Sequence, residues 1–196
     1  MKKNFINLVY DYVINENFDS THDLGHILRV TKNAEFIAKN ENADIEVVII
    51  SALLHDIARN DELSGKIEDH ALEGARRAEI FLRKIKYPKY RKVSYCIEHH
   101  RFRKKNIPET LEAKIIQDAD RLDALGYVGI TRVFMHKNGG DLKERIEHFY
   151  EKILKLKHLM NTKTAKILAE EKSKIVETFI KGLQKELLYV YEVDDG

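Results

Sequence analysis

The sequence predicts an all-α protein, a compact bundle of helices that ends in a helical hairpin. The 196 residues include only two prolines and nine glycines, so few helix breakers interrupt the chain. Apolar residues recur every three or four positions along most segments, which is the spacing of one face of an α-helix. No segment favours a strand over a helix. The length fits one domain over residues 1–196, with its core at about 20–135 and the hairpin at about 141–190.

Three helices are predicted in the first part of the chain. The first covers residues 4–17 and the second residues 23–40. A third follows Asp44, which is a suitable N-cap, and contains the apolar run at residues 47–54. The β-branched residues at the start of that run would also suit a strand. Its Ala-Leu-Leu ending and its helical neighbours favour a buried central helix.

Helical spacing continues to the end of the chain. Further helices are predicted at residues 69–83, at 89–99 after the Tyr87-Pro88 break, and at 111–125. The hairpin follows, with Thr162 as the expected N-cap of its second helix. Its first apolar stripe is expected at Leu142, Ile146, Phe149, Ile153, Leu156 and Met160, and its second at Leu168, Ile175, Phe179, Leu187 and Val190. We expect the hairpin to serve packing, and the alternative is a lid over a substrate.

Composition and charge narrow the class of protein. The 34 Lys and Arg residues nearly balance the 32 Asp and Glu residues, so no nucleic-acid partner is expected. A single cysteine, Cys96, excludes an intrachain disulfide and fits a reducing cytoplasm. The longest apolar run, residues 47–54, is far shorter than the roughly 20 residues that span a bilayer, and no signal-peptide core follows Met1. We expect a cytoplasmic protein without a membrane partner, and a homo-oligomer stays open.

Histidines on apolar helix faces are candidates for metal binding or catalysis. His55 and Asp56 end the most buried predicted helix, where a charged pair needs compensation. The alternative is a histidine that ends the helix and an aspartate that caps the next turn. His26 lies on the apolar stripe of its helix, and His100 lies on the apolar face that His99 does not share. Taken singly, each inward histidine could also be an ordinary core residue.

Acidic residues in a later apolar helix extend this set. Asp120 and Asp123 are three residues apart and share a face, whereas Asp118 points nearly the opposite way. Metal binding would explain why one or two of these acids lie in an apolar helix. We expect Asp118 to be a structural hydrogen-bond acceptor. His70 opens another helix, whose next turn carries Gly74 and so leaves room for close approach.

Four predicted helices thus each present an inward histidine or aspartate. One shared site explains this better than four unrelated core residues. Imidazoles combined with carboxylates suit Mn²⁺, Fe²⁺, Co²⁺, Ni²⁺ or Zn²⁺, and the absence of paired cysteines argues against a structural zinc site. A metal with open positions binds water, lowers the pKa of that water and polarises a phosphoryl oxygen. We therefore expect a divalent metal, first of all Mn²⁺ with Mg²⁺ as a further alternative.

Several stretches occur in an order that is specific to one group of proteins. They are HDLGHILRV at 22–30, ALLHDI at 52–57, IEHH at 97–100 and LEAKIIQDADRLDA at 111–124, followed by FYEK at 149–152 and LMNT at 159–162. This order resembles the HD superfamily of metal-dependent phosphohydrolases, and more closely its bacterial and archaeal branch of YedJ- and YpgQ-type proteins. A His-Asp dipeptide alone is a weak signal, but the ordered set with DADRLD is a strong one. The resemblance covers nearly the whole chain.

The resemblance implies an all-helical fold and a metal site. Its implied ligands are His26, His55, Asp56 and Asp120, and in dinuclear relatives two further histidines join them, whose places His70 and His100 would fill. It also implies hydrolysis of nucleoside triphosphates to a monophosphate and pyrophosphate. The connection at residues 137–140 is shorter than the loop expected in that branch, which bears on local substrate contacts and not on the metal site.

Other residues are candidates for catalysis or for substrate binding. His22 and Asp23 lie one turn before His26, so His22 could act as a general base, and the alternative is a pair that caps the start of the helix. Together with Asp123 they form the expected catalytic set. Positive side chains are candidates for binding the substrate phosphates, namely Arg101, Arg103, Lys104, Arg121, Lys152 and Lys155. The basic run after His100 could equally be a solvated surface.

Three functions agree with this set of residues. The first is a metal-dependent phosphohydrolase that acts on a nucleotide. The second is a dinuclear iron oxygenase built on the same ligands, which iron-type absorption would support. The third is a nucleotide sensor without catalytic activity. The intact ligand set speaks against the sensor, because binding alone does not require a metal that activates water.

Overall fold

The computed structural model describes residues 4–15, 24–101, 108–136 and 139–193. Every regular element within these ranges is a helix, which confirms the predicted fold class. In chain order they are α1 (Phe5–Ile14), α2 (Leu24–Glu41), α3 (Ile45–Leu54), α4 (Arg59–Leu63), α5 (His70–Lys84), α6 (Tyr90–Glu98), α7 (Leu111–Asp123), α8 (Gly126–Met135), α9 (Leu142–Glu151), the 3-10 helix η1 (Ile153–Leu159) and α10 (Lys163–Val193). None of the helices in the described ranges is long and apolar enough to cross a membrane.

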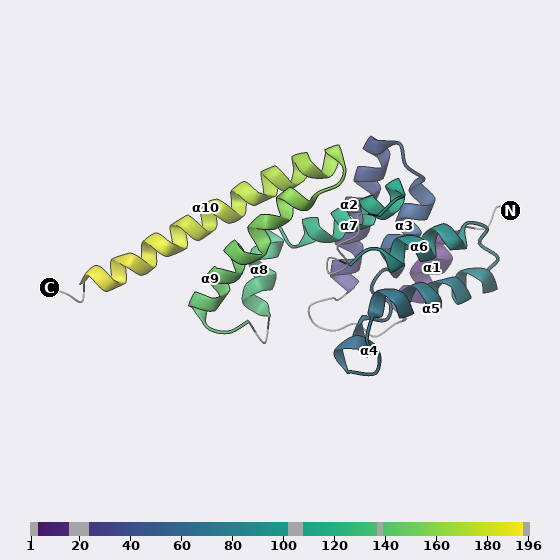
Figure 1. Cartoon of the computed structure of the whole chain (residues 1–196), viewed down its shortest axis with the longest axis horizontal. Helices are drawn as coiled ribbons and strands as arrows, with labels where there is room; N and C mark the ends of the chain where they lie inside the picture. Colours follow the sequence, from purple (N-terminus) through teal and green to yellow (C-terminus); the bar gives the residue numbers. More distant parts are fainter. Residues whose placement is uncertain (1–3, 16–23, 102–107, 137–138, 194–196) are drawn as a thin grey trace.

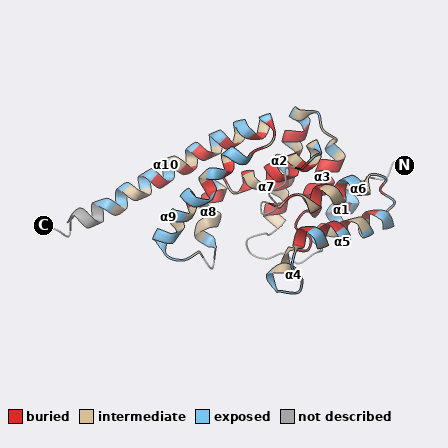
Figure 2. Cartoon of the chain, viewed as in Figure 1, coloured by how far each residue is buried: buried red, intermediate tan, exposed pale blue. Residues whose placement is uncertain are grey.

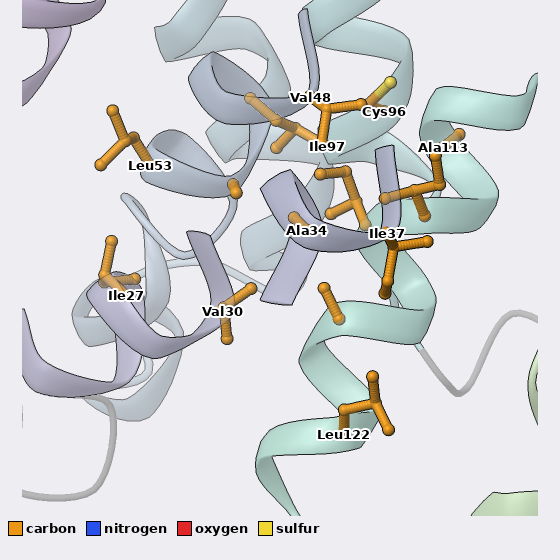
Figure 3. Close-up of a cluster of buried hydrophobic side chains, with 14 of the residues drawn as sticks. Ile27, Val30, Ala34, Ile37, Val48, Leu53, Cys96, Ile97, Ala113 and Leu122 are labelled. Atoms are coloured by element: carbon orange, nitrogen blue, oxygen red, sulfur yellow. The ribbon is translucent and has the colours of Figure 1, made fainter. Parts of the chain in front are cut away.

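The predicted buried helix, α3, lies at the centre of the bundle. It contacts α1, α2, α6 and α7, and α5 packs on the outer side of α6 (Figure 1). Asp44 caps α3 as predicted, since its side chain accepts a hydrogen bond from the backbone N–H of Val47. Buried residues gather where these helices meet (Figure 2). Figure 3 shows this core, in which apolar side chains of α2 face those of α3, α6 and α7.

Two helices, α4 and α8, were not predicted, and α8 lies beside acidic residues that we expected to be functional. Gly126 adopts a φ of 71°, which glycine reaches without strain, so the chain turns sharply between α7 and α8. Gly129 packs against the end of α7 so closely that a Cβ there would lie 2.2 Å from the carbonyl oxygen of Ala124. This tight packing holds α8 beside the C-terminal end of α7, where Asp120 and Asp123 lie. The other helix, α4, is a short segment that connects Asp56 to α5.

The C-terminal hairpin forms from α9 and η1 on one side and α10 on the other (Figure 1). Thr162 caps α10 as predicted, because its hydroxyl accepts from the backbone N–H of Ala165 at 3.3 Å. The first apolar stripe is buried from Phe149 to Met160, although Leu142 at its start is 40% exposed. The hairpin packs on α7 and α8, which agrees with the packing role that we expected.

The second apolar stripe of the hairpin was predicted in the wrong phase. The buried side chains of α10 belong instead to Ala165, Ala169, Ser173, Val176 and Ile180. Of the stripe that we predicted, Leu168, Ile175 and Leu187 are half-buried and Phe179 is 37% exposed, while the side chain of Val190 lies outside the described part. Small side chains let α10 approach its neighbours closely, and hydrophobic spacing weighted by bulky residues does not detect such a face.

Candidate metal centre

Four buried histidines converge on the carboxylate of Asp56. They come from α2, from the end of α3, from the first residue of α5 and from the residues after α6, and they are His26, His55, His70 and His100. Oδ2 of Asp56 lies 3.7 Å from Nε2 of His26 and 3.6 Å from Nε2 of His55. Oδ1 lies 3.2 Å from Nε2 of His70 and 3.6 Å from Nε2 of His100. The carboxylate therefore turns one oxygen toward each pair of histidines.

This division defines two half-sites. The first half-site consists of His26, His55 and Oδ2 of Asp56, together with Asp120, whose Oδ1 lies 3.5 Å from Nε2 of His26. The second half-site consists of His70, His100 and Oδ1 of Asp56. In each triad that includes Asp56, the ligand atoms lie within 4.8 Å of one another. The Asp120 side chain is 35% exposed, whereas those of His26 and His55 are fully buried.

Each of the four histidines is held through its other ring nitrogen, Nδ1. The partners are oxygens of Asp123 at 2.8 Å from His26, Ala52 at 2.7 Å from His55, Glu62 at 2.7 Å from His70 and Ile97 at 2.6 Å from His100. Carbonyl and carboxylate oxygens only accept hydrogen bonds, so Nδ1 carries the proton in each ring. The Nε2 lone pairs consequently face Asp56, which is the arrangement that histidine ligands of metals adopt.

The donor set fits a divalent cation. Nε2 of His55 is buried and makes no hydrogen bond, and Nε2 of His70 lies only 3.3 Å from Nε2 of His100. Unprotonated nitrogens so close to each other and to a carboxylate need a positive charge among them. Imidazole nitrogens with carboxylate oxygens are the ligands that Mn²⁺, Fe²⁺, Co²⁺, Ni²⁺ and Zn²⁺ accept.

The pKa values of two of these residues favour metal binding. Burial lowers the pKa of His55 to about 4, even though the charge of Asp56 opposes the shift, so His55 is neutral near pH 7. Burial alone would raise the pKa of Asp56, but its contacts with His55, His100 and His70 hold this pKa well below its usual value. A neutral imidazole and a charged carboxylate are the states that bind a metal without first releasing a proton.

Asp123 lies behind His26, on the side of the ring that faces away from Asp56. It is buried and accepts hydrogen bonds from Nδ1 of His26, from Nε of Arg29 at 2.7 Å and from Nη1 of Arg132 at 2.6 Å. Although burial raises the pKa of its carboxyl group, the hydrogen bonds to His26 and Arg29 lower it to about 2. We predicted a catalytic role for Asp123, and in the structure its carboxylate also orients the ring of His26.

Asp118 is a structural acceptor, as expected from its opposite helix face. Its carboxylate is fully buried and accepts hydrogen bonds from the backbone and side chain of both Asn161 and Thr162. It therefore ties α7 to the start of α10. It does not belong to either half-site.

The other candidates for catalysis or substrate binding are described only in part. His22, Asp23, Arg103 and Lys104 fall outside the described residues. The Arg101 side chain is 14% exposed, and it donates to Glu62 at 2.7 Å and to Asp69 at 3.1 Å. Arg121 donates to the carbonyl oxygen of Leu159, and Lys155 is exposed. Lys152 lines the cavity described next.

A cavity of about 610 Å³ lies between α8 and α9, and its lining includes Arg59 and Arg132. Two of its lining residues contact the metal ligands or their partners: Nη1 of Arg132 is 3.3 Å from Nδ1 of His26, and Nη1 of Arg59 is 3.0 Å from Nδ1 of His70. Sequence reasoning missed both arginines. Arg59 follows Asp56 by three residues, which was a usable signal, whereas nothing in the spacing connects Arg132 to His26.

The orientation of His99 and His100 agrees with their helical phase. His100 is buried against Asp56, whereas His99 stacks on Tyr95 with ring centroids 4.1 Å apart. We predict that His100→Ala lowers the metal content or the affinity of the second half-site for its metal at least roughly tenfold, because a ligand is lost. His99→Ala serves as the matched control and should change neither. Metal analysis of the two purified variants measures this, and the reverse outcome would show that the wrong histidine has been assigned.

Comparisons with known proteins are consistent with this geometry. The family model described as HD domain matches residues 23–125. The uncharacterised protein YpgQ of Bacillus subtilis (strain 168) is 34% identical over 182 residues, which cover 86% of this chain and 85% of YpgQ. A crystal structure of B. subtilis YpgQ in complex with ADP superposes with a TM-score of 0.74 at 34% identity, over 92% of this chain and 97% of that one. An HD-superfamily hydrolase from Bacillus thuringiensis gives a TM-score of 0.75 at 32% identity, over 95% and 98% of the two chains.

Proposed function

This chain belongs to the HD domain family, and from that premise we propose that it is a metal-dependent phosphohydrolase that acts on nucleoside triphosphates. The main support is the arrangement of four imidazole Nε2 atoms around the two oxygens of one buried carboxylate, Asp56. Neither packing nor ordinary hydrogen bonding requires such a cluster, and unpaired polar groups in the interior are destabilising. A resident cation accounts for all of them together.

The two half-sites would hold the cations. In the first half-site His26, His55, Asp56 and Asp120 are the ligands, and in the second the ligands are His70, His100 and the other oxygen of Asp56. We propose Mn²⁺ as the metal, with Fe²⁺, Co²⁺, Ni²⁺, Zn²⁺ or Mg²⁺ as alternatives. A bound divalent cation lowers the pKa of water and offsets negative charge on phosphoryl oxygens.

Positive side chains around the cavity would bind the phosphate groups of the substrate. Arg132 lies beside the first half-site and Arg59 beside the second, and both line the cavity. Guanidinium groups held in place by Asp123 and Glu62 need little reorganisation when charge develops on phosphate oxygens. Arg145 and Lys152 also line the cavity.

The cavity and one relative support a nucleotide as the substrate. A volume of about 610 Å³ lies in the range of sites for small organic ligands. The structure of YpgQ in complex with ADP shows that a protein 34% identical to this one takes up a nucleotide. We propose that the oxygen of a water molecule attacks the α-phosphorus. The bond between the α-phosphorus and the oxygen that bridges to the β-phosphorus breaks. The products are the nucleoside monophosphate and pyrophosphate, in which the β and γ groups are still joined.

We predict that the purified protein releases pyrophosphate and a nucleoside monophosphate in equal amounts from a nucleoside triphosphate. Mn²⁺ should support a higher rate than Mg²⁺, because imidazole ligands favour the former. Separate assays for pyrophosphate and orthophosphate, run with and without a chelator, measure this. Orthophosphate as the sole phosphate product would exclude attack at the α-phosphorus and leave metal-dependent hydrolysis standing. If no nucleotide is hydrolysed by the metal-loaded protein, the proposed function is wrong.

A dinuclear iron oxygenase is the second candidate. One observation favours it: a carboxylate with a histidine pair at each oxygen would suit two iron ions as well as two Mn²⁺ ions. Iron-type absorption of the purified protein, together with the absence of nucleotide hydrolysis, would support this reading over the first.

A further inference from the structure

We propose that Glu62 is a positioning residue that sets the affinity of the second half-site for its cation. This inference rests on the proposed function, because it assumes that both half-sites bind metal. Glu62 lies in α4, the short helix between Asp56 and His70. It is not a metal ligand in either triad.

Glu62 contacts His70 at two points. Its Oε2 accepts from Nδ1 of His70 at 2.7 Å, and its Oε1 accepts from the backbone N–H of the same residue at 3.4 Å. The first contact places the proton on Nδ1, which leaves the lone pair of Nε2 directed at Oδ1 of Asp56, 3.2 Å away. The second contact holds the backbone of His70 at the first residue of α5. Ring orientation and tautomer therefore both depend on one carboxylate.

The Glu62 carboxylate is itself held by two arginines. Nη1 of Arg59 donates to Oε2 at 2.6 Å, and Nη1 of Arg101 donates to Oε1 at 2.7 Å. Arg101 also donates to Asp69, the N-cap of α5, and directly follows His100 in the chain. The same carboxylate thus links the segment that carries His100 to the helix that carries His70. Glu62 is 17% exposed, so these pairs are better shielded from water than surface ion pairs.

The first half-site is supported by different residues. His55 is held by the carbonyl oxygen of Ala52 in its own helix, and His26 is held by Asp123 from α7. The first half-site also offers four ligating residues including Asp120, whereas the second offers three. Loss of Glu62 should therefore weaken the second half-site and leave the first intact.

Titration of the metal-free full chain with Co²⁺ tests this, with the bound metal counted by equilibrium dialysis and the d–d absorption recorded. The wild type should bind two equivalents, and His100→Ala identifies the step that belongs to the second half-site. In Glu62→Gln we expect that step to weaken about 10- to 100-fold, as for other residues that orient histidine ligands, while the first step stays within about twofold. The matched control is Asp61→Asn in the same helix. The Asp61 carboxylate pairs with Arg77 and Lys66, so both steps should persist.

The outcomes separate this inference from the proposed function. Two unchanged steps in Glu62→Gln, or equal weakening of both, would overturn the positioning role. A wild-type protein that binds one equivalent would overturn it as well, but would leave a mononuclear hydrolase in place. A wild type that binds no cobalt would contradict the proposed function and this inference together. If Glu62→Gln does not fold, Glu62→Asp is the variant to measure. Its shorter side chain keeps the negative charge beside the arginines but moves the carboxylate away from His70. The same selective weakening of the second half-site is therefore expected.

Discussion

Replacement of Asp56 by asparagine is expected to remove metal from both half-sites and to slow hydrolysis roughly a hundredfold or more. Asp56 supplies one oxygen to each half-site, and within the described residues it is the acid that both triads share. Asparagine has nearly the same shape, but it lacks the negative charge, and its amide nitrogen cannot replace the second oxygen as a ligand. The two half-sites should therefore fail together. His55→Ala should lose metal and activity in the same way through the first half-site.

Metal content per chain, circular dichroism and the rate of hydrolysis, measured on the same preparations, test this prediction. We expect both variants to stay folded, because apolar side chains form most of the core around α3. Asp61→Asn is the matched control, because it makes the same chemical change five residues later at a partly exposed position. Wild-type metal content and turnover in either Asp56→Asn or His55→Ala would show that the assigned ligands are wrong.

Replacement of Asp118 by alanine is expected to lower the free energy of unfolding by roughly 3–5 kcal/mol, the largest effect on stability that we predict. The carboxylate accepts from the backbone N–H groups of Asn161 and Thr162, both at 2.8 Å, and from both of their side chains. Alanine would leave these donors without their acceptor at the point where α10 begins. Each stranded buried donor costs about 1–3 kcal/mol.

Thermal and denaturant unfolding measure this effect, and the melting temperature should fall by roughly 10 °C for a chain of this size. Lys114→Ala in the same helix is the control and should change stability by no more than about 0.5 kcal/mol. Because Asp118 lies outside both half-sites, the folded variant should keep its full metal content. A loss of metal without a loss of stability would mean that Asp118 belongs to the metal site after all.

Local spacing was enough to predict all the described helices except α4 and α8, and the direction in which most site residues point. In a helix, each residue's position fixes the face on which its side chain lies, so a stripe of apolar neighbours shows whether a histidine or an aspartate points inward. For this reason the sequence alone distinguished His100 from His99 and separated Asp118 from Asp120. It also predicted the caps at Asp44 and Thr162, since short polar side chains at helix starts act on backbone N–H groups nearby.

Only the tertiary structure decided how these residues meet. Arg59, Glu62 and Arg132 are charged residues of the kind that usually face water. No spacing rule shows that Glu62 holds the ring of His70, or that Arg59 and Arg132 hold the carboxylates of Glu62 and Asp123. Which side of α10 is buried likewise depended on how closely neighbouring helices approach, and not on where its bulky residues lie. The division of Asp56 into one oxygen for each half-site depends on the relative placement of α2, α3, α5 and α6, which hydrophobic packing over the whole bundle determines.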